Sequence, residues 1–215
     1  MKIEQKLEQI KELSEIVQPI RLEKIFKYSQ ERTNYITVVL EDINQSHNIS
    51  AALRSCDCFA IQQVHIIESV HRYKVNEGIS RGADKWLDVH KYNSRGTNNT
   101  QICLEKLKSQ DYKIIATTPH AKDMLIDQIS LDQKIAVIFG TEEKGLSKTA
   151  LDQADYYAKI PMYGFTESFN ISVSVAVTLY DLVKRLRESN ISWKLTPEQL
   201  VDLRLTWLKK SVHIL

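Results

Sequence analysis

Four short runs of β-branched and other apolar residues, separated by stretches with helical periodicity, constrain the fold of this 215-residue chain most strongly. They occupy residues 36–41, 64–67, 112–117 and 135–139. Runs of this kind are typical of strands buried on both faces, and strands that alternate with helices form a mostly parallel sheet. The sequence therefore predicts an α/β body with helices on both faces of its sheet.

The other expected elements follow from periodicity and breakers. Within the body we expect helices and one more strand at about residues 48–59, 99–109, 147–154, 157–160 (the strand) and 170–188. Outside it, helices are expected at 2–17, at 20–31 after Pro19, and at 197–210, where Thr196 provides an N-cap and Pro197 a first-turn residue. The predicted organisation is an N-terminal helical arm (1–35), an α/β body (36–189) and a C-terminal helical arm (190–215).

Composition excludes several classes of protein. The 29 basic and 27 acidic residues give a net charge of only +2, and 43% of residues are hydrophobic, as in ordinary globular proteins. No apolar run approaches the roughly 18–20 residues that span a bilayer, and the N-terminus lacks the apolar segment of a signal peptide. Three cysteines, with Cys56 and Cys58 one residue apart, match neither a disulfide framework nor a zinc site. We expect a cytoplasmic protein without a membrane segment or a metal.

Phosphate-binding glycine motifs are missing. No G-x-G-x-x-G follows a predicted strand, which argues against a Rossmann site and against the glycine-rich loop of common methyltransferases. Residues 140–147 come close to a P-loop, but Leu146 stands where that motif needs lysine, and Glu142 and Glu143 would repel a triphosphate. A nucleoside triphosphatase is therefore excluded, while a plain strand–turn–helix connection stays open for this loop.

Three polar loops follow predicted strands, at residues 42–54, 140–147 and 160–172. Ligands of open α/β sheets bind at the carboxyl ends of the strands, so these loops are the candidate site. Local alternatives remain: Asn48 suits a helix N-cap, Arg54 suits a solvated helix face, and the Ser and Asn residues near 170 suit the cap of a core helix.

Taken together and in this order, the three loops resemble the motifs of the SpoU/TrmH branch of the SPOUT RNA 2′-O-ribose methyltransferases. The matching segments are Asn48-Ile49-Ser50-Ala51-Ala52-Leu53-Arg54 followed by Cys56-Asp57, then residues 138–147, and then residues 160–162 and 168–174. Residues 21–42 and 82–87 also look like the TrmH tRNA enzymes, which methylate the ribose of guanosine 18 in the D-loop. Two features depart from the pattern: Phe169 stands where leucine is usual, and the last helix is shorter and differently charged than in some relatives.

The resemblance implies a trefoil-knotted C-terminal part of the body, a homodimer with its site between subunits, and S-adenosyl-L-methionine (AdoMet) as cofactor. The residues that it implies for cofactor binding are Thr117, Thr118, Pro119, Phe139, Gly140, Gly145, Ile160, Met162, Ser168 and Phe169. It assigns activation of the ribose hydroxyl to Arg54. The other catalytic residues that it implies would position Arg54 and the ribose by hydrogen bonds, namely Asn48, Glu142, Ser168 and Asn170. A guanidinium keeps its proton to about pH 12 or above, so binding a phosphate and stabilising the forming alkoxide is physically easier for Arg54 than acting as a base.

Local charge supports tRNA as the partner more than net charge does. Six basic residues face three acidic ones in residues 71–95, and the C-terminal arm is also basic, whereas residues 2–32 are balanced with seven basic and six acidic residues. A local excess of this kind is typical of contact with a nucleic-acid backbone, although it carries no sequence information. The alternatives left open are methylation of rRNA or of another tRNA ribose, and a non-catalytic RNA-binding protein of the same fold.

Overall fold

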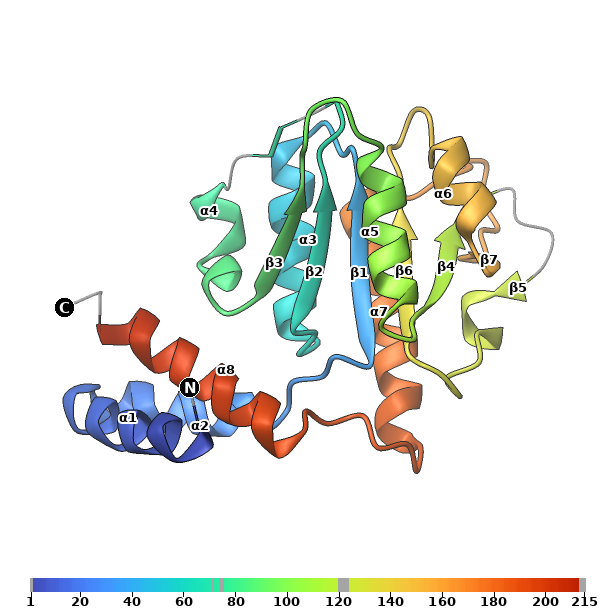
Figure 1. The fold of residues 1–215 in the computed structure, drawn as a ribbon. Coiled ribbons are helices and arrows are strands. Elements are labelled where there is room, and N and C mark those ends of the chain that lie inside the picture. Colours follow the sequence, from blue (N-terminus) through green and yellow to red (C-terminus); the bar gives the residue numbers. More distant parts are fainter. Residues whose placement is uncertain (1, 71, 74–75, 120–123, 213–215) are drawn as a thin grey trace. The chain divides into compact units, whose positions relative to one another are not determined.

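The computed structural model describes residues 2–70, 72–73, 76–119 and 124–212 (Figure 1). The chain divides into two compact units: Tyr35–Ser192, and Met1–Asn34 together with Trp193–Leu215. The first unit contains the sheet and the three polar loops, and the described residues of the second form helices and their connections.

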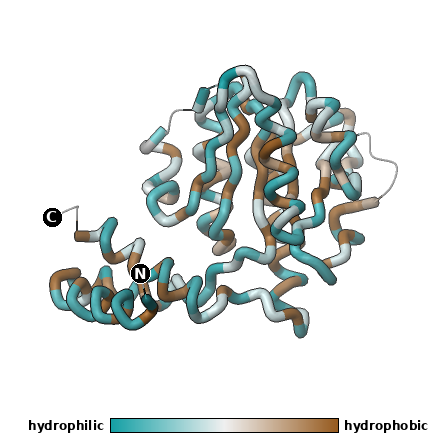
Figure 2. Tube along the Cα trace, in the orientation of Figure 1, coloured by the Kyte–Doolittle hydropathy of each residue, from teal (hydrophilic) through white to brown (hydrophobic). Residues whose placement is uncertain are grey.

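The larger unit is built on a seven-stranded sheet with the order β3-β2-β1-β6-β4-β7-β5. All described strand pairs are parallel. The strands are β1 (Ile36–Glu41), β2 (Gln63–Ile67), β3 (Asp88–Tyr92), β4 (Lys113–Thr117), β5 (Met124–Leu125), β6 (Ile135–Phe139) and β7 (Tyr156–Lys159). Every residue of the central strands β1 and β6 is buried, and the tube in Figure 2 is mostly hydrophobic there. The predicted parallel sheet is confirmed.

Helices cover both faces of this sheet, as predicted. The helices α3 (Ser46–Cys58) and α7 (Ile171–Glu188) pack against each other on one face, and α5 (Asn99–Lys108) and α6 (Lys148–Gln153) pack on the other (Figure 1). Beneath α5, buried side chains such as Leu104 and Leu107 join Val39, Ile114 and Ile138 of the strands in one core cluster. This two-sided burial explains why the central strands read as continuous apolar runs.

Several short elements were not predicted. Strand β3 pairs with β2 at the edge of the sheet, yet its residues are polar and only partly buried, so they carry no signal of a buried strand. The other unpredicted elements are β5, the one-turn helix α4 (Glu77–Ser80) and the 3-10 turns η1 (Ala83–Lys85) and η2 (Ile126–Gln128). Elements this short depend on their neighbours more than on their own propensity.

The smaller unit consists of α1 (Ile3–Ile16), α2 (Pro19–Ser29) and α8 (Pro197–Val212), which confirms the three terminal helices. As predicted, Thr196 caps α8: its hydroxyl accepts a hydrogen bond from the Gln199 amide at 3.3 Å, and its own amide donates to the Gln199 side chain at 3.0 Å. Arg204 of α8 donates to Ser29 at 3.0 Å and lies over the ring of Phe26. These contacts join sequence segments from the two ends of the chain.

Candidate active site

Side chains from all three polar loops meet at one carboxylate. Oε1 of Glu142 accepts hydrogen bonds from Asn170 Nδ2 at 2.8 Å, from the Ile171 amide at 3.1 Å and from Asn48 Nδ2 at 3.3 Å. Asn170 Nδ2 also donates to Asn48 Oδ1 at 3.1 Å. Asn48, Glu142 and Asn170 therefore form one hydrogen-bonded cluster, which we call the loop triad, and it joins the start of α3, the loop after β6 and the start of α7.

The two asparagines take part in the loop triad for different reasons. Helix α3 begins at Ser46 with Gln45 as its N-cap, so the interpretation of Asn48 as an N-cap is wrong. Asn48 lies in the first turn with only 4% of its surface exposed, and its side chain turns toward Glu142. Asn170 does cap α7, because its Oδ1 accepts from the Ser172 amide at 2.9 Å. That cap orients Nδ2 of Asn170 toward Glu142.

The loop after β6 presents Glu142 on a tight backbone turn. Thr141 and Gly145 exchange two backbone hydrogen bonds of 3.1 and 2.9 Å, and the Lys144 amide donates to Thr141 Oγ1 at 3.0 Å. Gly145 adopts a positive φ of 66°, which favours glycine. A Cβ on Gly140 would lie 2.3 Å from backbone atoms of Gly145, so the turn closes only without a side chain there. The glycines of this segment thus build a turn for Glu142 instead of a phosphate cradle.

Glu41 anchors the far end of the same loop and was not singled out by the sequence analysis. It ends β1, is 3% exposed, and accepts hydrogen bonds from Thr100 Oγ1 at 2.6 Å, from Ser147 Oγ at 2.7 Å and from the Ser147 amide at 2.8 Å. Ser147 is the N-cap of α6. The carboxylate therefore ties the starts of α5 and α6 to the central strand. Its only signal in the sequence is an acid at the end of an apolar run.

A cavity of about 330 Å³ adjoins the loop triad. It is lined by all ten residues that the sequence analysis singled out for cofactor binding, namely Thr117, Thr118, Pro119, Phe139, Gly140, Gly145, Ile160, Met162, Ser168 and Phe169. The lining also contains the predicted catalytic residue Glu142 and its neighbours Thr141, Glu143 and Lys144 in the candidate loop 140–147. The lining residues that were not predicted to bind the cofactor are Leu146, Leu151, Ala158, Lys159, Ile171, Ser174 and Thr178. Three of these residues, Ile171, Ser174 and Thr178, are spaced to lie on one face of α7, and this spacing could have indicated from the sequence that they share a surface. The volume is that of a typical small-molecule pocket.

The lining of the cavity combines buried apolar residues with exposed charged ones. Phe139 and Ala158 are fully buried and apolar, whereas Glu143 and Lys144 are exposed. An apolar wall accepts a flat ring, and exposed charges accept a charged group without the cost of burying it. The lining therefore offers both buried apolar surface for an aromatic base and exposed charges for a charged group.

Arg54 lies outside the loop triad. It is on α3, six residues after Asn48, its side chain is exposed, and within the described chain it makes no hydrogen bond or ion pair. Ser168 lines the cavity and makes no hydrogen bond to the loop triad. The structure thus brings Asn48, Glu142 and Asn170 into contact and leaves the Arg54 side chain available to a ligand.

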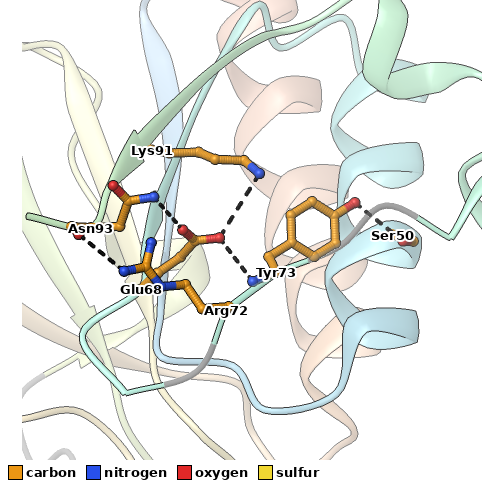
Figure 3. Close-up of polar contacts among 6 residues, drawn as sticks. All are labelled: Ser50, Glu68, Arg72, Tyr73, Lys91 and Asn93. Carbon is orange, nitrogen blue, oxygen red and sulfur yellow. Dashed lines mark hydrogen bonds and ion pairs between the residues drawn. The ribbon is translucent and has the colours of Figure 1, made fainter.

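A second polar cluster braces α3 between Asn48 and Arg54 (Figure 3). The hydroxyls of Ser50 and Tyr73 lie 3.2 Å apart, and the Tyr73 amide donates to Glu68 Oε1 at 2.8 Å. Asn93 Nδ2 donates to the other Glu68 oxygen at 2.8 Å, and Lys91 lies over the Tyr73 ring. Burial raises the pKa of Tyr73, Asp84 adds to the rise and the Ser50 contact opposes it, so the phenol stays protonated. We call the Ser50–Tyr73–Glu68 contacts the α3 brace.

The stretch of chain that contributes Tyr73 to the α3 brace carries exposed basic side chains, namely Arg72, Arg81, Lys85, Lys91 and Arg95. His71 and Lys74, which also belong to the stretch 71–95, lie outside the described residues. In the described ranges, no three His, Cys, Asp or Glu side chains are grouped to hold a metal ion. None of the helices described is long and apolar enough to cross a membrane.

Comparison with known proteins identifies the family. The model of the SpoU rRNA methylase family matches residues 35–180. A relative from Borreliella burgdorferi named tRNA (guanosine(18)-2′-O)-methyltransferase is 39% identical over 206 residues, covering 96% of this chain and 92% of the relative. The crystal structure of the Aquifex aeolicus TrmH/SpoU tRNA modifying enzyme superposes with a TM-score of 0.80 at 25% identity, over 89% of this chain and 96% of that one.

A more distant structure shares the fold. The SpoU methyltransferase AviRb from Streptomyces viridochromogenes, solved in complex with its cofactor AdoMet, has a TM-score of 0.63 at 20% identity, covering 74% of this chain and 63% of that one. The family match spans the parallel sheet, the loop triad and the cavity. This chain belongs to the SpoU rRNA methylase family.

Proposed function

We propose that this protein transfers a methyl group from AdoMet to a ribose 2′-hydroxyl of tRNA, at guanosine 18. The observation that carries the proposal is that one cavity collects all ten expected cofactor residues beside the loop triad. The choice of tRNA and of guanosine 18 is supported by the relative that bears this name, because the similarity extends over 96% of this chain.

The cavity fits AdoMet in the chemistry of its lining. Apolar side chains and backbone groups around Phe139, Leu146 and Ala158 would hold the adenine, and the exposed charges of Glu143 and Lys144 would face the amino-acid end. No phosphate cradle is needed, because AdoMet carries no phosphate. When bound, AdoMet supplies an electrophilic methyl group on its sulfonium.

Arg54 would stabilise the negative charge that develops on the ribose 2′-oxygen as its proton leaves. A guanidinium is permanently charged, and this one is exposed and free to reach RNA. The loop triad would hold α3 and α7 in register, so that Arg54 on α3 and Ser168 before α7 keep fixed positions around the reacting atoms. Such positioning accounts for several kcal/mol of rate acceleration in enzymes.

The basic surface around the α3 brace would bind the tRNA backbone. Arg72, Arg81 and Lys85 are exposed in a stretch whose basic residues outnumber the acidic ones two to one. Neutralising phosphates releases counterions and gives affinity that falls with salt. We further expect action in the cytoplasm, in keeping with the absence of a disulfide bond among the cysteines of the described residues.

The homodimer and the knot are part of the same proposal. Val173, Val177 and Tyr180 are exposed apolar residues at helical spacing on one face of α7, which suits a partner subunit. After β7, near one edge of the sheet, the chain returns past the loop that follows β6 to bond with Asn48 of α3. This return path supports a trefoil-knotted arrangement of residues up to about 189.

The test is the replacement Arg54→Ala, measured with AdoMet carrying a labelled methyl group and unmodified tRNA. Loss of the guanidinium is expected to lower the rate by at least about 100-fold. Binding of S-adenosyl-homocysteine should be unchanged, because Arg54 does not line the cavity. Lys108→Ala, at the end of α5, is the matched control and should keep full activity.

Two results would count against the proposal. Full turnover by Arg54→Ala would remove the assigned role of this residue. Mapping of ribose methylation in RNA from cells with and without the gene would refute guanosine 18 if the lost methyl group lies elsewhere.

A further inference from the structure

A buried hydroxyl in the cavity wall has no hydrogen-bond partner in the part of the chain that the structure describes. Thr178 lies on the α7 face that also carries Ile171 and Ser174, and all three line the cavity. Its side chain is 0% exposed, and its Oγ1 finds no hydrogen-bond partner among the described residues. All residues that line the cavity belong to the described part of the chain. Among them, only Thr178 has a buried polar side-chain atom without a hydrogen-bond partner.

The buried hydroxyl of Thr178 lowers the stability of the protein when no ligand is bound. A threonine within a helix often returns its hydroxyl to the carbonyl four residues earlier, but no such bond joins Thr178 to Ser174 in the described helix. A buried hydroxyl without a partner keeps the full penalty of leaving water, whereas valine, which has nearly the same shape, would avoid it. The stability of the ligand-free protein therefore does not explain why a hydroxyl stands at this position.

The position of Thr178 indicates which part of a ligand would satisfy it. The fully buried members of the lining include Phe139, Ala158 and Thr178, whereas the charged members Glu143 and Lys144 are exposed. A charged amino-acid group is costly to bury in such a wall, while a neutral purine is not. Threonine has two accessible χ1 rotamers in a helix, so one rotation can turn the hydroxyl to a ligand.

We propose that Thr178 is a specificity-determining residue of the cavity, whose hydroxyl forms a hydrogen bond with the adenosine part of the bound cofactor. The inference rests on the proposed function, since it takes AdoMet as the ligand. It adds a side-chain hydrogen bond to the fully buried part of the lining, where Phe139 and Ala158 are apolar. Because valine can fill the same volume, the hydroxyl contributes to ligand selection and not to packing.

The experiment compares the wild-type chain with Thr178→Val by calorimetric binding and by thermal unfolding without ligand. The probes are S-adenosyl-homocysteine and 5′-methylthioadenosine, of which the second lacks the charged amino-acid end. The variant should bind both probes about three- to tenfold more weakly, the effect of one net hydrogen bond. The melting temperature of the free protein should be unchanged or higher. Thr178→Ser, which keeps the hydroxyl, should bind both probes as the wild type does.

Thr37→Val is the matched control. Thr37 is also 0% exposed, but it lies in β1 and its hydroxyl donates to the Gln63 carbonyl at 2.7 Å. This variant should melt at a lower temperature and bind both probes normally. The two threonine-to-valine changes are thus expected to have opposite signatures.

Any of the following results would contradict the inference or a part of it. Normal binding of both probes by Thr178→Val, or a fall in its melting temperature like that of Thr37→Val, overturns the inference. Weaker binding of S-adenosyl-homocysteine alone overturns the assignment to adenosine. If Thr178→Val does not fold, Thr178→Ala gives the same comparison. Failure of the wild-type chain to bind either probe overturns the proposed function itself and the inference with it.

Discussion

At the scale of single residues, the site depends on where a side chain is missing as much as on where one is present. Gly140 follows β6, and a Cβ there would lie 2.3 Å from the backbone carbon and oxygen of Gly145. Backbone atoms cannot rotate aside as the end of a flexible side chain can. The turn that carries Glu142 therefore requires glycine at this position.

Replacing Gly140 with alanine should displace residues 141–145 and draw Glu142 away from Asn48 and Asn170. A displacement of about 1 Å near the reacting atoms can cost about 100-fold in rate, and we expect a loss of that size in methyl transfer. Gly164→Ala is the control, because no atom of the described residues lies within 4 Å of a Cβ there. Equal activity of the two variants would show that the turn tolerates the side chain.

At the scale of elements, α3 carries Asn48 at its start and Arg54 two turns later, so its position sets the distance between the loop triad and the exposed guanidinium. The α3 brace fixes this helix from the side, through the contact between Ser50 and Tyr73. The same contact joins α3 to the stretch that bears the exposed basic residues. Helix position and RNA contact should thus change together.

Tyr73→Phe removes the hydroxyl of the α3 brace and keeps the ring. We expect it to raise the KM for tRNA several-fold and to lower the free energy of unfolding by about 1 kcal/mol, measured by steady-state kinetics and urea denaturation. Tyr92→Phe is the control: its hydroxyl lies 3.0 Å from His65 Nδ1 on β2 and forms no hydrogen bond with α3 within the described residues. It should lose similar stability and keep the wild-type KM. A KM equally raised in both variants would contradict the role of the brace.

At the scale of the whole molecule, a net charge of +2 conceals an uneven distribution. Basic residues gather in 71–95 and near the C-terminus, while acidic residues balance the N-terminal helices. Apolar surface is also uneven, since Val173, Val177 and Tyr180 leave an exposed stripe on α7. Both surfaces have the character of contact surfaces, one for a polyanion and one for a second copy of the chain.

Val177→Glu puts a charge in the middle of that stripe. If two copies of the chain pair through α7, the variant should elute as a 24.9 kDa monomer in light scattering after gel filtration, and the wild type at twice this mass. Ile102→Glu introduces the same charge at an exposed apolar position of α5 and should leave the mass of the wild type unchanged. A wild-type monomer would rule out the proposed pairing.

Helices and strands could be predicted where the residues of the segment itself form a clear hydrophobic pattern. Strands 36–41 and 135–139 match β1 and β6 residue for residue, because burial on both faces demands an unbroken apolar run. Strand β3 gave no such signal, because an edge strand with polar residues reads like a loop. The interpretation of Asn48 as an N-cap was wrong because its partner, Glu142, lies 94 residues away along the chain.

By itself, the sequence determined the parallel α/β fold, the exclusion of a phosphate-binding loop and the residue types at the three loops, since these depend on periodicity, turn chemistry and charge along short segments. Only the tertiary structure decided that Glu142 holds Asn48 and Asn170 together and that Glu41 anchors α5 and α6. It also decided that Thr178, on a buried face of α7, lines the cavity. These contacts join residues far apart in the chain, and their geometry is fixed by how the helices pack on the sheet.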